Sequence, residues 1–195
     1  MRRRSVLAIP LAAPLLLPAS AVRARGIAED LRHGGYVIYM RHAETFASPE
    51  PTLGDFRDCL WQRNLTPAGK AQAEATGEHL RKLGTRYSRV WSSPFCRCRD
   101  TAQLVATRVA EQTEDLLYHV TQTPNQQTAG VERLRILLSN REPGGRVTLL
   151  VGHAPPFKSL TGIGLAEGRG AIIRPRQTKE FDIAGYVDAT GVHAR

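Results

Sequence analysis

Short apolar runs alternate with amphipathic stretches along most of this 195-residue chain. The runs have the length of buried strands and lie at 36–40, 89–91, 116–118, 147–151, 171–173 and 181–183. The run at 147–151 is the clearest central strand, and the one at 116–118 is the weakest. The last two runs predict later, antiparallel strands.

Helices are expected between these runs. Thr66 and Pro67 supply an N-cap and a first-turn proline, so a helix should begin there and continue to Gly84. The residues expected on its buried face are Ala71, Ala75, His79 and Leu80. Pro94 should open a second helix that runs to about residue 110. A third helix is expected over 131–139, with Val131, Leu134, Leu137 and Leu138 facing inward.

The alternation of strands and helices, without repeats or a linker, predicts an α/β fold. We expect a three-layer sandwich with a mostly parallel central sheet and helices on both faces. Residues 41–65 contain two prolines and no helical or strand period, so they should form a long loop. A loop of this length within a compact domain is usually functional.

The first 24 residues have the order of regions found in a secretory signal peptide. Three arginines at 2–4 precede an apolar run at 6–17, which small residues follow. The segment 3–7 also resembles a twin-arginine export motif. Cleavage is expected after Ala21 or Ala24, which predicts a signal peptide over 1–24 and one domain over 25–195. Prolines at 10, 14 and 18 argue against a retained membrane anchor, so we expect a periplasmic or secreted protein.

Composition and charge narrow the classes of function. The chain is 42% hydrophobic and 23% charged, as globular proteins are, and its net charge is +9. Removing 1–24 takes four arginines and no acid, which leaves 23 basic against 18 acidic residues and a charge of +5. No basic run alternates with aromatic residues, so no nucleic-acid partner is expected. No cluster of Cys and His has zinc-like spacing, so no metal is expected.

Basic and imidazole side chains follow three of the predicted strands. Arg41 and His42 end the first, Arg97 comes shortly after the second, and His153 follows 147–151. In open α/β sheets ligands bind beyond the carboxyl ends of the strands, so these four side chains should converge. Arginine forks match phosphate oxygens, and a neutral imidazole can attack phosphorus. The pattern therefore predicts a phosphate pocket.

Four motifs in this order, RHAET, RNLTPAGKAQA, SSPFCRCRDTA and VGHAPPF, resemble those of the histidine phosphatase superfamily, the phosphoglycerate mutase-like or RHG enzymes. The resemblance covers roughly 36–175. It implies a phosphoglycerate mutase-like fold and a histidine acid phosphatase-like phosphomonoesterase that acts on a small phosphorylated substrate without a cofactor. It makes His42 the nucleophile that forms a phosphohistidine. Arg41 and Arg97 would grip the phosphoryl oxygens, and His153 would complete the pocket.

Some roles stay open at this point. Ala154 stands where phytase-like members carry an acid, so the proton donor is Glu167, which we favour, or Asp55 or Asp58, or there is none. Arg63, Asn64 and Thr45 are candidates for binding substrate, although packing at the helix entry explains Arg63 and Asn64 equally well. The remaining histidines, expected to be structural or exposed, are His33, His79, His119 and His193.

The three cysteines allow two interpretations. Cys59 and Cys96 should both lie near the rim of the pocket, where a disulfide would pin the long loop to the second helix. The alternative is three reduced, buried thiols. Cys98 should point elsewhere on its helix.

Three functions therefore compete. The first is a phosphomonoester hydrolase that acts through a phosphohistidine on His42. The second is a non-catalytic module that binds phosphate ligands, which the missing acid favours. The third is a phosphoglycerate mutase-type phosphotransferase, against which the predicted export argues.

Overall fold

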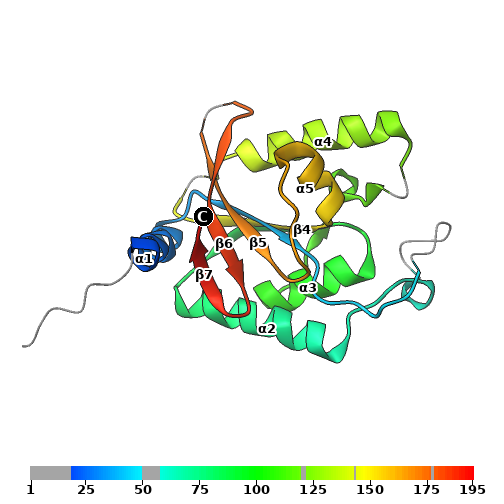
Figure 1. Ribbon diagram of the computed structural model, residues 1–195, viewed down its shortest axis with the longest axis horizontal. Coiled ribbons are helices and arrows are strands. Elements are labelled where there is room, and N and C mark those ends of the chain that lie inside the picture. The colour runs from blue at the N-terminus through cyan, green and yellow to red at the C-terminus, as the bar shows by residue number, and fades with distance from the viewer. Residues whose placement is uncertain (1–18, 50–57, 120–121, 143, 177) are drawn as a thin grey trace, which may run out of the picture.

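The structure is a computed structural model, and it describes residues 19–49, 58–119, 122–142, 144–176 and 178–195 (Figure 1). Within these residues a seven-stranded sheet has the order β3-β2-β4-β1-β5-β6-β7. Its strands are β1 (Val37–Arg41), β2 (Tyr87–Ser92), β3 (Glu111–Gln112), β4 (Val147–Gly152), β5 (Gly170–Pro175), β6 (Phe181–Asp188) and β7 (Gly191–Ala194). The helices are α1 (Ala19–His33), α2 (Pro67–Lys82), α3 (Cys96–Ala106), α4 (Pro124–Ser139) and α5 (Ala154–Thr161).

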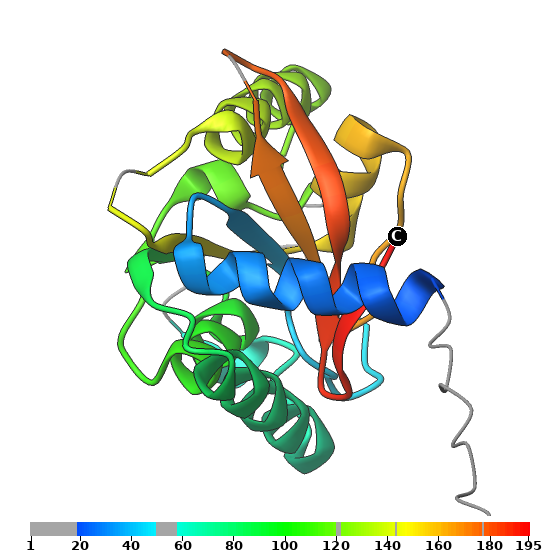
Figure 2. The same cartoon turned by 90° about the vertical axis from the view of Figure 1, so that its left-hand side faces the viewer.

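Helices cover both faces of the sheet, which confirms the predicted three-layer α/β fold (Figures 1 and 2). Because successive side chains of a strand point to opposite faces, β1 contributes to two cores. Ile38 and Met40 pack in the core that contains buried residues of α1, α2 and α3. Val37 and Tyr39 pack in the core that contains buried residues of α4 and α5.

The sheet has a parallel part and an antiparallel part, and the antiparallel strands β5 and β6 are those predicted from the last two apolar runs. Strands β3, β2, β4 and β1 run parallel, whereas β5, β6 and β7 pair antiparallel with their neighbours. The connections from β5 to β6 and from β6 to β7 are too short for a crossover, which parallel pairing requires. The parallel half places the carboxyl ends of β2, β4 and β1 at one edge.

Helix α2 begins as predicted but buries a different face. The Thr66 side chain accepts a hydrogen bond from the Gly69 amide at 2.8 Å and so caps the helix. Its buried residues are Gly69, Ala73, Thr76, Gly77 and Leu80, whereas Ala71 is exposed and Ala75 and His79 are half-buried. A Cβ on Gly69 would lie 2.1 Å from the Glu44 carbonyl oxygen. The inward face is therefore marked by small residues that allow close backbone packing, which a search for apolar residues misses.

Other boundaries differ for local reasons. α3 begins two residues after Pro94 and ends at Ala106, because Thr107 adopts a left-handed conformation with φ of 54°. The predicted strand at 116–118 is wrong: the Thr113 side chain caps a 3-10 turn over Glu114–Leu116. α4 begins seven residues before 131, because a capping box between Thr123 and Gln126 starts it. In that helix Leu134 and Leu138 are buried, whereas Val131 and Leu137 are only partly buried.

The apolar run of the predicted signal peptide falls within 1–18, outside the described residues, and both predicted cleavage positions fall within α1. The second half of this helix belongs to the fold, since Ile27 and Leu31 are buried in the core beside β6 and β7 (Figure 2). Within the described parts of the chain, no helix is both long enough and apolar enough to cross a membrane.

Candidate active site

A pocket of about 160 Å³ lies at the sheet edge where β1 and β4 end. Its lining residues are Arg41, His42, Arg63, Arg97, Tyr118, His153, Ala154 and Pro155. The pairing of Arg41 with Gly152 places the end of β1 beside the end of β4. The structure thus brings together the four side chains that the sequence pattern predicts to converge.

His42 is buried at 4% exposure in the position that follows β1. Its backbone amide donates to the Gly152 carbonyl oxygen at 3.0 Å. Its ring nitrogen Nδ1 lies 2.9 Å from the Ala43 carbonyl oxygen, which can only accept a hydrogen bond. Nδ1 must therefore carry the proton, and Nε2 keeps a lone pair, as a nucleophilic imidazole requires.

His153 is held from several sides at the end of β4. Its Nε2 lies 3.1 Å from the Ser93 hydroxyl oxygen, and Nη2 of Arg97 lies 3.5 Å from its Nδ1. The ring stacks on Tyr118 with centroids 5.0 Å apart and meets the His42 ring edge to face at 5.5 Å. These contacts fix the orientation of the imidazole beside the nucleophile.

Arg97 enters the pocket from the first turn of α3 and is 1% exposed. The centre of its guanidinium lies 4.4 Å from the centroid of the Phe95 ring. A buried guanidinium is costly unless it meets a negative charge or strong acceptors. Because Arg97 lines the pocket, a phosphate dianion bound there would meet this positive charge.

Both pocket histidines are neutral near neutral pH. Burial, as the largest cause, and the positive charges of Arg97, Arg41 and Arg63 together lower the pKa of His42 to about 3, against the opposing effect of the Ala43 carbonyl. Burial and the Arg97 charge also hold the pKa of His153 well below its ordinary value. The electrostatics of the pocket thus keep the nucleophile unprotonated.

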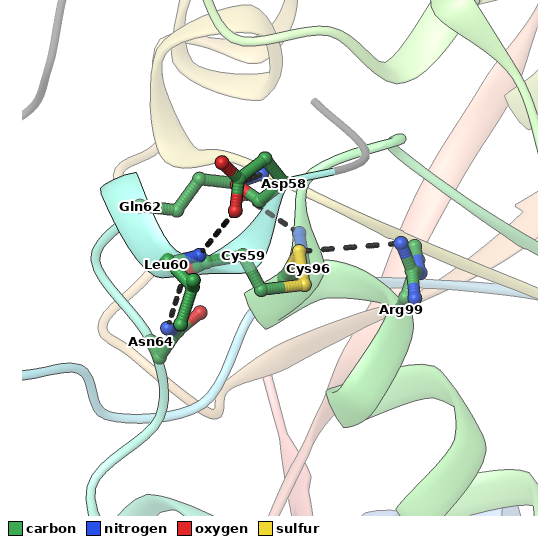
Figure 3. The surroundings of a disulfide bond; sticks show 7 residues. All are labelled: Asp58, Cys59, Leu60, Gln62, Asn64, Cys96 and Arg99. Carbon is green, nitrogen blue, oxygen red and sulfur yellow. Dashed lines mark hydrogen bonds between the residues drawn. A yellow bond between two sulfur atoms is a disulfide. The ribbon is translucent and has the colours of Figure 1, made fainter. Parts of the chain in front are cut away.

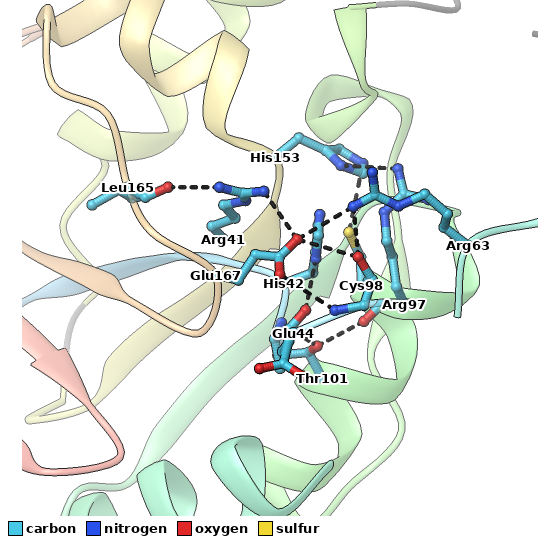
Figure 4. A network of polar contacts seen from close by, with 12 residues as sticks. Arg41, His42, Glu44, Arg63, Arg97, Cys98, Thr101, His153, Leu165 and Glu167 are labelled. Atoms are coloured by element: carbon cyan, nitrogen blue, oxygen red, sulfur yellow. Dashed lines mark hydrogen bonds and ion pairs between the residues drawn. The ribbon is translucent and has the colours of Figure 1, made fainter. Parts of the chain in front are cut away.

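A group of polar side chains centred on Glu167 lies beside the pocket (Figure 4). Arg63 lines the pocket and donates from Nη2 to the Thr45 hydroxyl at 2.6 Å and to Glu167 at 3.3 Å. Arg41 donates from Nη2 to Glu167 at 3.0 Å. Asn64 instead donates to the Cys59 carbonyl oxygen at 2.7 Å, so it stabilises the loop and does not line the pocket.

The candidate proton donors are placed as follows. Among the described residues, the pocket lining contains no carboxylate. Asp58 accepts from the Leu60 amide at 2.9 Å and caps the 3-10 turn Cys59–Trp61. Asp55 lies outside the described residues. Glu167 contacts Arg41 and Arg63 beside the pocket and is not part of its lining.

The model of the histidine phosphatase superfamily (branch 1) matches residues 37–118, which include Arg41, His42 and Arg97. This segment, about two fifths of the chain, is similar to the histidine phosphatase superfamily. His153 lies beyond the matched segment, and the fold brings it into the pocket.

The comparison with curated proteins finds the mitochondrial serine/threonine-protein phosphatase Pgam5 of Drosophila virilis, 31% identical over 83 residues. The match covers 43% of this chain and 25% of that protein. The corresponding proteins of Drosophila persimilis and Drosophila pseudoobscura are each 28% identical over 78 residues, 40% of this chain and 24% of theirs. The chain thus spans about a quarter of the length of the curated relatives it matches.

Two solved structures share the fold. The protein histidine phosphatase SixA complexed with tungstate has a TM-score of 0.57 at 17% identity, covering 80% of this chain and 97% of that one. A putative alpha-ribazole-5'-P phosphatase from Escherichia coli has a TM-score of 0.59 at 17% identity, covering 76% and 94%. At these identities the likeness concerns the fold.

A disulfide joins Cys59 and Cys96 (Figure 3). It ties the loop that carries Arg63 to the first turn of α3, where Arg97 lies. A second tie runs parallel to it, because the Cys96 amide donates to the Gln62 side chain at 2.9 Å. The bond therefore fixes the spacing of two segments that supply arginines to the pocket.

Cys98 is the buried free cysteine. The sequence predicts that it points elsewhere on its helix than Cys96, and in the structure its thiol contacts a pocket histidine. Its Sγ lies 3.5 Å from Nε2 of His153 and 3.5 Å from the Gly152 carbonyl oxygen. Helix α3 packs on β4, and this packing, which the spacing of residues along α3 does not reveal, brings Cys98 to His153.

The remaining histidines lie outside the pocket lining. His79 contacts the Ala189 carbonyl oxygen at 3.0 Å, and His193 lies 3.0 Å from an Asp188 carboxylate oxygen. His119 is half-buried, and His33 is exposed.

Acid should destabilise the folded protein. The unfolded chain binds a proton at His42 below the ordinary pKa of 6.5, whereas the folded chain binds it only near pH 3. Stability is therefore greatest above pH 6.5 and is lost as the pH falls toward 3. The slope for His42 alone approaches about 1.4 kcal/mol per pH unit, and His153 adds to it in the same direction. Urea unfolding between pH 7 and 4 measures the slope, which His42→Gln should reduce. An equal slope in that variant would contradict the assignment.

Breaking the disulfide should lower stability. The bond closes a long loop, since its cysteines are 37 residues apart, and loop closure of this size is worth about 3–4 kcal/mol. Reductant, or the double variant Cys59→Ser/Cys96→Ser, should lower the free energy of unfolding by this order. Cys98→Ser keeps the bond and is the matched control, so it should respond to reductant as the unchanged protein does. An unfolding curve insensitive to reductant would refute the prediction.

Proposed function

We propose that the protein is a phosphomonoester hydrolase that acts through a phosphohistidine on His42. The observation that carries this proposal is the tautomer of His42. Its Nδ1 is 2.9 Å from the Ala43 carbonyl oxygen, so the Nε2 lone pair is available within a pocket that three arginines line. The arginines stabilise the charge on the phosphoryl oxygens, and the imidazole attacks phosphorus.

The reaction has two steps. In the first, Nε2 of His42 forms a bond to phosphorus as the bond from phosphorus to the leaving oxygen breaks, and the leaving oxygen takes a proton from solvent. In the second, water attacks phosphorus, the phosphorus–nitrogen bond breaks, and inorganic phosphate leaves with the Nε2 lone pair restored. Arg41, Arg63 and Arg97 donate to the phosphoryl oxygens in both steps, which lowers both barriers.

The pocket favours esters with good leaving groups, because no described carboxylate lines it as a source of protons. The finer proposal is an acid phosphatase-like activity. Since the pKa of His42 is lowered to about 3, the nucleophile stays neutral at pH 5. Aryl phosphates are the substrates that we expect to be hydrolysed fastest.

A panel of phosphate esters tests the proposal. Aryl phosphate, a phosphoserine peptide, phosphohistidine and a sugar phosphate cover leaving groups of very different acidity. Phosphoserine and phosphohistidine are included because two proteins of similar fold are a phosphoserine phosphatase and a protein histidine phosphatase. We expect turnover of at least the aryl phosphate, with an acid-labile phosphate trapped on His42 and mapped by mass spectrometry. A phosphate trapped on another residue, or no turnover on any ester, would overturn it.

The second candidate is a module that binds phosphate ligands without turnover. The same pocket favours it, since its described lining offers three cations and no acid. Saturable binding of inorganic phosphate with no turnover across the panel would establish it. A mutase is not supported, because a retained phosphoenzyme with acid–base transfer needs a carboxylate that the described pocket lining lacks.

We also propose that the protein is exported. The arginines at 2–4 and the apolar run at 6–17 support this, and Ile27, the first core residue among the α1 side chains that the structure describes, lies beyond both cleavage positions. Removing the signal after Ala21 or Ala24 would thus keep Ile27 and Leu31 in the core. Mass spectrometry of protein recovered from the periplasm or medium would give the new N-terminus, and recovery of uncleaved protein only from the cytoplasm would contradict export.

A further inference from the structure

We propose that Glu167 is a positioning residue that holds Arg41 and Arg63 at the pocket, and that it is not the proton donor to the leaving group. The inference rests on the proposed phosphoryl transfer, because it assigns the two arginines a common support in that reaction. It departs from the expectation that favoured Glu167 as the acid.

The contacts of the carboxylate carry the first step. Oε1 of Glu167 lies 3.0 Å from Nη2 of Arg41 and 3.3 Å from Nη2 of Arg63. The Thr45 hydroxyl donates to the same oxygen at 3.2 Å, and the Thr45 amide donates to Oε2 at 3.4 Å. A proton donor needs an O–H directed at the leaving group. Here both oxygens face donors, and Figure 4 shows the carboxylate between the two guanidiniums.

Each arginine has a second anchor besides Glu167. Nη1 of Arg41 donates to the Leu165 carbonyl oxygen at 3.1 Å. Nη2 of Arg63 donates to the Thr45 hydroxyl at 2.6 Å. Two anchors on a planar guanidinium fix its orientation as well as its position. Both arginines are about a quarter exposed and line the pocket. The fixed orientation of their guanidiniums therefore determines where phosphoryl oxygens meet hydrogen-bond donors.

The segment that carries Glu167 is itself fastened to the nucleophile. The Gly168 amide donates to the His42 carbonyl oxygen at 2.9 Å, and the Gln72 side chain donates to the Glu167 carbonyl oxygen at 3.0 Å. Gly168 has a φ of +73°, and a Cβ there would lie 2.1 Å from the Gln72 side chain. Glycine is thus needed for this approach. The attacking imidazole and the two arginines are therefore aligned by one short segment.

Kinetics of Glu167→Ala and Glu167→Gln on two esters test the assignment. 4-Nitrophenyl phosphate and phenyl phosphate differ mainly in the acidity of the leaving group. We expect kcat of Glu167→Ala to fall roughly 30-fold, by the same factor on both, because misplaced donors act on the transition state. KM and the inhibition constant for inorganic phosphate should change less than about threefold, because two effects oppose each other. The greater mobility of the arginines weakens phosphate binding, and removal of the negative charge of Glu167 strengthens it. Glu167→Gln should recover most of kcat, because its amide oxygen still accepts hydrogen bonds.

Two results would overturn the inference. A loss that is far larger on phenyl phosphate, with Glu167→Gln as impaired as Glu167→Ala, would make Glu167 the proton donor. An unchanged kcat with a lower unfolding midpoint would make its ion pairs merely structural. Glu132 is the matched control, because its carboxylate also bridges two cations, Lys179 at 2.7 Å and Arg135 at 3.3 Å, outside this pocket. Glu132→Ala should leave kcat unchanged.

A second readout does not depend on turnover. The ¹⁵N relaxation of the arginine Nε–H groups reports how rigidly Arg41 and Arg63 are held. Both should become more mobile in Glu167→Ala and stay rigid in Glu132→Ala. Unchanged mobility would overturn the positioning role even in a protein without activity, whereas absence of turnover in the unchanged protein would overturn only the proposed function.

Discussion

Substituting Ala for His42 is expected to lower kcat on aryl phosphate by on the order of 10⁴-fold or more, the loss typical of removing a nucleophile. The phosphohistidine cannot form without Nε2, and among the described residues that line the pocket His153 offers the other imidazole. His153 cannot replace it, because its Nε2 faces Ser93 and its Nδ1 faces Arg97. A steady-state assay with continuous detection of the released phenolate measures the loss.

Two checks keep this result interpretable. His42→Asn preserves a polar side chain of smaller size that can still donate to the Ala43 carbonyl oxygen, so it should be as inactive as His42→Ala while perturbing the fold less. Circular dichroism and urea unfolding should show both variants folded. Inorganic phosphate should still bind the variants, since all three arginines remain. Hydrolysis that persists in a folded His42 variant would exclude the proposed mechanism.

Replacing Arg97 by Lys should lower kcat by about 10²–10³-fold, although the positive charge is kept. The guanidinium of Arg97 is buried at 1% exposure and lies over the Phe95 ring, where its planar fork presents several donors in fixed directions. An ammonium is a single point charge and cannot bridge two phosphoryl oxygens in the same geometry. Kinetics on aryl phosphate measure the effect.

Arg99 is the matched control for this prediction. It lies two residues further along α3, is half-buried, and its Nη1 is 4.0 Å from the Cys96 sulfur. Arg99→Lys should leave kcat within about twofold, because Arg99 does not line the pocket. Equal losses for Arg97→Lys and Arg99→Lys would show that the charge of the helix, and not the fork at Arg97, acts on the substrate.

The sequence located the pocket because its key residues directly follow apolar strands. His42 and His153 stand immediately after β1 and β4. The apolar runs that predict these two strands therefore also place both histidines at the carboxyl edge of the sheet. Arg97 reaches the same edge, because only a short connection separates the end of β2 from the start of α3. Parallel pairing then brings segments more than 100 residues apart to one place.

Other features could not be predicted from periodicity. Glu167 lies in the irregular segment between α5 and β5, so nothing local indicates that its carboxylate meets Arg41 and Arg63. A pattern of apolar residues does not reveal the buried face of α2, because Gly69 and Gly77 pack closely through their lack of a side chain. Two-residue β3 is too short to have a period, and α5 begins with Ala154 and two prolines, which resemble a loop.

The central position of β1 has a consequence for the order of folding. This strand pairs with β4, which begins 110 residues later at Val147, and with β5, which begins at Gly170. Such non-local pairing raises the contact order and slows folding. A growing chain therefore carries its nucleophile on a strand without either neighbour until most of the protein has been synthesised. The pocket, whose lining includes His153 at the end of β4, assembles among the last parts of the molecule.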